Sequence, residues 1–118
     1  MKDITEASTN KDLAKRSCKP CETGEGKLKE TQIKTLKQQL RGKWKLTGGR
    51  QLENSFDFPD FKKALAFVNR VGKIAEEQGH HPDIFLTYGN VRLQLSTHHA
   101  GGLTENDFIL AAKVNALK

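Results

Sequence analysis

An amphipathic segment bounded by a proline and a glycine constrains the fold more than any other part of this chain. Pro59 and Asp60 are typical of a helix start, where an acidic side chain faces the positive end of the helix dipole. Gly79 stands where a helix commonly ends. The sequence therefore predicts one long helix between them, with a single apolar face formed by Phe61, Ala64, Leu65, Val68, Val71, Ile74 and Ala75.

Two shorter segments on either side of this helix also carry helical patterns. Residues 31–40 end near Gly42 and repeat apolar residues at helical spacing, namely Ile33, Leu36 and Leu40. Thr104, with Asp107 three residues later, resembles a capping box in which Asp replaces the usual Glu. A third helix is therefore expected from there to about residue 117, through Phe108, Ala111, Ala112 and Val114.

Four segments carry strand signals, and the first two form a predicted hairpin. Residues 43–46 surround the only tryptophan, Trp44. A Gly48-Gly49 turn then leads into residues 51–58, whose inward positions are expected to be Leu52, Phe56 and Phe58.

The second predicted hairpin joins residues 84–88 to residues 91–97 at Gly89-Asn90, a signal for a tight turn. Its second strand alternates polar residues with Val91, Leu93 and Leu95, as a half-buried antiparallel strand does. The element order is then α-β-β-α-β-β-α. We expect an α+β fold, a two-layer sandwich in which a four-stranded antiparallel sheet carries its helices on one face.

All four histidines lie within one window of twenty residues, as His80-His81 and His98-His99. The first pair follows the predicted long helix, and the second follows the last predicted strand. Because a hairpin brings the start of one strand beside the end of the other, we expect His80 or His81 to lie near His98. One imidazole can protonate a departing oxygen while another accepts a proton, so the cluster favours acid–base catalysis.

Carboxylates near the histidines strengthen this hypothesis. Glu76 lies one helical turn before His80 and could hydrogen-bond its ring and fix the tautomer, and Asp107 completes the cluster. The histidines could instead be capping and turn residues. A zinc or iron site is a further alternative, but the HExxH spacing is absent and adjacent histidines in extended chain project to opposite sides. No serine or cysteine stands in a nucleophile context, and no phosphate-binding glycine loop is present.

The basic charge is concentrated in the first half of the chain. The net charge is +6, with 13 Lys/Arg against 6 Asp/Glu in residues 1–50 and 7 against 8 in residues 51–118. Aromatic residues do not interleave with the basic ones, so we expect a solvated helix and tail, and nucleic acid is an unlikely partner. No apolar run approaches the ~20 residues of a membrane span, and no secretory signal is visible, so a cytoplasmic protein without membrane contact is expected.

The first 27 residues are expected to be a flexible extension, with a mobile tail over residues 1–12. Cys18 and Cys21 form a single CxxC beside Pro20, in a loop-like, glycine-containing context. One CxxC is half of a structural zinc site, so a reduced local feature is favoured. Zinc shared across subunits and redox activity stay open as alternatives.

The histidine window resembles the signature of the pterin-4a-carbinolamine dehydratases. The resemblance extends over about residues 28–117, within one domain expected over residues 28–118, and the CxxC stretch is similar to the extension of bacterial-type members. The matching residues are Glu76-x3-His80-His81-Pro82, Tyr88, Ser96-Thr97-His98, Gly102-Leu103-Thr104 and Asp107, with Trp44 and Phe58-Pro59-Asp60-Phe61 upstream.

The resemblance implies dehydration of a 4a-hydroxytetrahydropterin to quinonoid dihydropterin in tetrahydrobiopterin recycling, without metal or cofactor. His80 and His98 would be the acid–base pair and His81 would assist, while Glu76 would tune His80. The implied binding and supporting residues are Glu76, Ser96, Thr97, Asp107, Tyr88 and Trp44. A homodimer or homotetramer is implied, and His99 lies outside the pattern. The alternative is a non-enzymatic dimerisation or transcriptional coregulator module that has the same fold.

Overall fold

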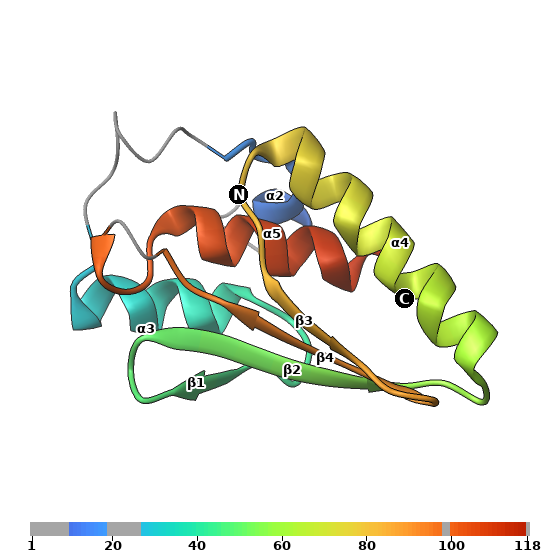
Figure 1. The fold of residues 1–118 in the computed structure, drawn as a ribbon. Helices are drawn as coiled ribbons and strands as arrows, with labels where there is room; N and C mark the ends of the chain where they lie inside the picture. Colours follow the sequence, from blue (N-terminus) through green and yellow to red (C-terminus); the bar gives the residue numbers. More distant parts are fainter. Residues whose placement is uncertain (1–9, 19–26, 98–99, 118) are drawn as a thin grey trace.

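The computed structural model describes residues 10–18, 27–97 and 100–117, and it contains one four-stranded antiparallel sheet with helices over one face (Figure 1). The strand order is β1-β2-β4-β3, which leaves β1 and β3 at the edges. The strands are β1 (Lys45–Thr47), β2 (Gln51–Asp57), β3 (Asp83–Leu86) and β4 (Asn90–Leu95). The two-layer α+β prediction is therefore confirmed.

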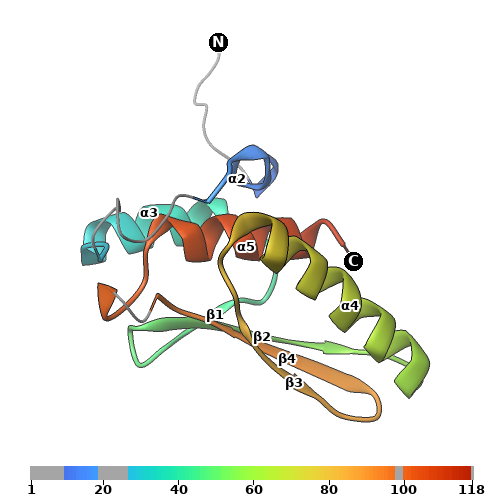
Figure 2. The same cartoon turned by 45° about the horizontal axis from the view of Figure 1, so that its top comes forward.

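The second layer is formed by α3 (Glu30–Gln39), α4 (Phe61–Gln78) and α5 (Glu105–Asn115), and the short helix α2 (Asn10–Lys15) packs on the outer side of α5. Helix α5 contacts all three of the others, and Figure 2 shows it with α2 above it and the sheet below. Eight of its 11 residues are buried, which explains why its sequence shows only a weak amphipathic pattern. None of the helices in the described residues is long and apolar enough to cross a bilayer.

Helix α2 was not predicted, because a flexible extension was expected over residues 1–27. Instead, Asn10–Lys15 is helical and Leu13 is completely buried within the main core. A helix of six residues is too short to be stable alone, so its stability must come from packing against α5. A six-residue segment also carries too little periodicity for a sequence pattern to reveal it.

Helix α4 begins and ends where the sequence predicts. The Asp60 carboxylate accepts a hydrogen bond from the Lys63 N–H at 2.8 Å, and Gly79 ends the helix with φ of 65°, a left-handed conformation that favours glycine. The predicted apolar face, however, is partly wrong, since Phe61 and Leu65 are 44% and 39% exposed. The buried stripe is rotated toward the residues Ala64, Phe67, Val71 and Ala75.

Candidate active site

The end of α4 and the β3–β4 hairpin together determine where His80 lies. After the Gly79 turn, the His80 N–H still donates to the Ala75 carbonyl at 3.2 Å, and the chain then enters β3. Asp83 of β3 pairs with Gln94 of β4. Since His80 lies three residues before Asp83 and Thr97 three residues after Gln94, the antiparallel register brings His80 and Thr97 to the same end of the hairpin.

A buried hydrogen bond joins His80 to helix α5. The Nε2 atom of His80 lies 2.6 Å from Oδ1 of Asp107, and the two residues are 6% and 0% exposed. A carboxylate only accepts hydrogen bonds, so Nε2 carries a proton, and whenever the ring is neutral its Nδ1 atom keeps a lone pair. Among the described residues, none makes a hydrogen bond to Nδ1. Asp107 therefore fixes a tautomer in which Nδ1 can accept a proton.

The Asp107 carboxylate is itself held by two threonines. Its Oδ2 atom accepts from the Thr97 hydroxyl and from the Thr104 N–H, both at 2.9 Å. The two threonine hydroxyls lie 2.9 Å apart, and because Thr97 donates to Asp107, Thr104 is the donor between them. The contact from the Thr104 N–H belongs to the predicted capping box of α5, which is confirmed. Both carboxylate oxygens thus accept hydrogen bonds, and the carboxylate cannot rotate without losing them.

The second described histidine has a different partner and a different environment. The Nε2 atom of His81 lies 2.5 Å from Oε2 of Glu76, and both side chains are mostly exposed. The prediction that Glu76 hydrogen-bonds His80 is therefore wrong. His80 turns into the core toward Asp107, and His81 projects to the other side, where Glu76 on the last turns of α4 can meet it.

A cavity of about 240 Å³ lies beside Thr97, at the end of the sheet. It is lined by Arg50, Gln51, Ser96, Thr97, Gly101 and Gly102. Ser96 and Thr97 were predicted to be substrate-binding residues, whereas Arg50 and Gln51 were missed. Gln51 lies near Ser96 because its neighbour Leu52 pairs with Leu95. The register between β2 and β4 cannot be read from the sequence alone, so the sequence did not reveal this proximity.

The structure does not bring Trp44 or Tyr88 to this site. Trp44 is 2% exposed and donates through Nε1 to Oδ1 of Asn115 at 2.9 Å, at the opposite end of α5 from Asp107, about 12 Å along the helix. Tyr88 is 70% exposed and lies beyond the far end of β3, about 16 Å along the strand direction from Asp83. Trp44 is therefore a core residue, and Tyr88 a surface residue of the hairpin turn.

Three residues that the sequence analysis singled out, Cys21, His98 and His99, lie outside the described residues. Among the residues that are described, no cluster of three or more His, Cys, Asp or Glu is arranged to hold a metal ion.

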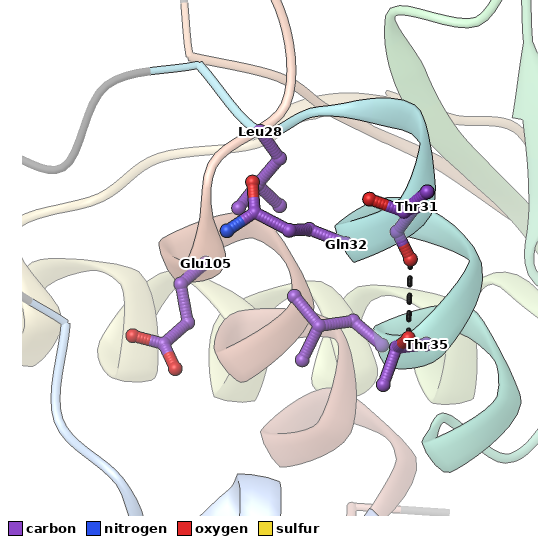
Figure 3. A pocket seen from close by; sticks show the side chains of 6 residues that line it. Leu28, Thr31, Gln32, Thr35 and Glu105 are labelled. Carbon is purple, nitrogen blue, oxygen red and sulfur yellow. Dashed lines mark hydrogen bonds between the residues drawn. The ribbon is translucent and has the colours of Figure 1, made fainter.

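A larger cavity, of about 410 Å³, lies between α3 and the start of α5, and none of the histidine-pair residues lines it (Figure 3). Its walls are Leu28, Thr31, Gln32, Thr35, Leu36 and Glu105, mostly small polar and apolar side chains. Among the described residues that line this cavity, Glu105 is the one titratable residue.

Comparisons with known proteins identify the family of this chain. The family model for pterin 4 alpha carbinolamine dehydratase matches residues 26–117. A protein of Rubrobacter xylanophilus that provisionally carries that enzyme's name is 46% identical over 106 residues, which cover 90% of this chain and 98% of the relative. A similarly named protein of Alkaliphilus metalliredigens is 44% identical, over 87% of this chain and 93% of the relative.

Solved structures of the same fold carry more than one description. A crystal structure from Brucella melitensis, described as a transcriptional coactivator/pterin dehydratase, superposes with a TM-score of 0.72 at 35% identity, covering 78% of this chain and 98% of that one. A pterin dehydratase-like protein described as a RuBisCO assembly factor gives 0.57 at 28% identity, covering 65% and 90%. With the family model matched over nearly the whole described fold and relatives this similar, the chain belongs to the pterin 4 alpha carbinolamine dehydratase family.

Proposed function

We propose that this chain catalyses the dehydration of a 4a-hydroxytetrahydropterin to quinonoid dihydropterin and water. In this reaction N5–H loses its proton, a C4a=N5 double bond forms, and the C4a hydroxyl leaves as water once it is protonated. One proton is taken up and one is given, without net oxidation. Two imidazoles are suited to this exchange, because each can act as acid or base near neutral pH.

The observation that carries the proposal is the buried His80–Asp107 pair. Asp107 holds the Nε2 proton, so the Nδ1 atom of His80 is the base that would take the proton from N5. His98 would be the acid that protonates the departing hydroxyl, with His81 assisting. The contact between Nε2 of His81 and the Glu76 carboxylate would hold the His81 ring in place for this role.

The 240 Å³ cavity beside Thr97 is the place where we expect the substrate to bind. Thr97 belongs both to its wall and to the hydrogen-bond network of Asp107, so a ring bound there would lie close to the His80 pair. Ser96 offers polar groups in the same wall for the amide-like edge of a pterin. We infer that the protein is cytoplasmic. We also infer a homodimer or homotetramer, since β1 and β3 leave two strand edges that a second copy could pair with.

The test is stopped-flow absorbance decay of enzymatically generated 4a-hydroxytetrahydropterin, compared with the uncatalysed rate. His80→Ala and His98→Ala should each lose tenfold or more in rate, as expected for groups that contribute about 10²–10⁴. His99→Ala is the matched control, because that residue lies outside the family signature, and it should keep the wild-type rate. Absence of acceleration by folded wild-type protein would overturn the proposal.

A second candidate function is a non-enzymatic interaction module with this fold. Its support is the description of two structural neighbours as a coactivator/pterin dehydratase and as a RuBisCO assembly factor. The same variants separate the two hypotheses, because an interaction module would keep its partner, measured by pull-down, when His80 and His98 are replaced. An enzyme would lose turnover.

A further inference from the structure

We propose that the segment formed by residues 12–18, here called the N-terminal strap, positions the His80–Asp107 pair, and that Gln78 is the residue through which it does so. The kinetic part of this inference rests on the proposed function. The structural part concerns only the geometry of the pair. The strap comprises the last four residues of α2 and the three residues that follow it, and it reaches the end of α4 and the beginning of α5, beside His80 and Asp107.

On the α4 side, the strap binds the residue that ends the helix. The backbone N–H of Cys18 donates to Oε1 of Gln78 at 2.8 Å. Gln78 is the last residue of α4, and only Gly79 separates it from His80. A displacement of the Gln78 side chain would therefore move the turn that directs His80 into the core.

On the α5 side, the strap binds the residues immediately before Asp107. The thiol of Cys18 donates to the carbonyl of Asn106 at 3.7 Å, and Arg16 forms an ion pair with Glu105. The beginning of α5 is thus held by the same residue, Cys18, that holds the end of α4.

The strap is anchored by burial and by a further contact from α5. Leu13 is completely buried in the main core, and Nζ of Lys113 donates to the Ala14 carbonyl at 2.7 Å. These contacts lie on α2 and on the last turn of α5, away from His80. Because the strap is attached to α5 there, it cannot move freely with Gln78. It can therefore fix the distance between the end of α4 and the beginning of α5.

A fixed separation matters because the pair is short and buried. The His80–Asp107 distance of 2.6 Å tolerates little relative movement of α4 and α5. Misplacement of a catalytic group by 1 Å can lower a rate by as much as ~10²-fold. The strap therefore bears on the reaction although none of its residues faces the 240 Å³ cavity.

The test compares Gln78→Met with Gln78→Glu in the full-length chain. Methionine keeps the length of the side chain and removes the oxygen acceptor, whereas glutamate restores an acceptor for the Cys18 N–H. Gln38→Met makes the same change at an exposed position of α3 and is the matched control. Two readouts are taken: the ¹⁵N shifts of the His80 ring, which report its tautomer and hydrogen bonding, and the pH profile of kcat and KM for dehydration.

Gln78→Met should shift the His80 ring resonances and lower kcat about tenfold with little change in KM, while Gln78→Glu restores both and Gln38→Met changes neither. Wild-type ring shifts in Gln78→Met would overturn the inference, even if its melting temperature falls, because the contact would then be structural only. If wild-type protein does not accelerate dehydration, the proposed function fails, and the ring shifts alone still decide whether the strap positions His80.

Discussion

Replacing Asp107 by asparagine should separate the fold of this protein from its chemistry. In the native site, Oδ2 accepts from Thr97 and Thr104 while Oδ1 accepts from Nε2 of His80. The single oxygen of asparagine can keep both threonine donors. Its NH₂ group must then face Nε2, which has to become an acceptor. The ring proton therefore moves to Nδ1, and the lone pair that would take the substrate proton is lost.

The magnitudes of the two effects should differ widely. The backbone bond of the capping box and the Thr97 bond survive, and only the charge assistance is lost, so the free energy of unfolding should fall by about 1–3 kcal/mol. The catalytic loss should be far larger, about 10²–10⁴-fold in kcat, because the wrong tautomer removes general-base catalysis.

Three measurements check this prediction on one protein sample. Urea denaturation gives the change in stability, long-range ¹H–¹⁵N spectra give the His80 tautomer, and stopped-flow dehydration gives kcat. A variant that shows the reversed tautomer and yet turns over at the wild-type rate would refute the role assigned to Nδ1. A variant that keeps the proton on Nε2 would refute the hydrogen-bond argument itself.

Substitutions at Leu13, Trp44 and Thr97 test other parts of the structure. Leu13→Ala should lower the free energy of unfolding by about 2–5 kcal/mol in urea denaturation, whereas Leu65→Ala, at a partly exposed position, should cost clearly less. Equal costs would show that α2 does not pack as described. Trp44→Phe removes the bond to Asn115 and should cost about 1 kcal/mol while kcat/KM stays unchanged; a large kinetic loss would place Trp44 in the site after all. Thr97→Val should lower both stability, by about 1–2 kcal/mol, and kcat, since Asp107 loses a donor, and Thr97→Ser should restore both.

Elements with long, regular patterns could be predicted from the sequence. The sequence predicts helix α4 with its Asp60 start and Gly79 end, and it predicts the Thr104–Asp107 capping box. The apolar face of α4 was only partly correct, because burial depends on which side meets the sheet. Helix α2 was not predicted, because its single buried leucine is buried only when the helix packs against α5.

The sequence by itself determined the types and the order of the elements that follow α2, because these follow from local periodicity and turn residues. Only the tertiary structure decided the partners. It paired His80 with Asp107 and left Glu76 to His81, although Glu76 is nearer to both histidines along the chain. The physical reason is that partner choice depends on which way each ring points after the Gly79 turn, and on the register of β3 with β4, and neither is a local property.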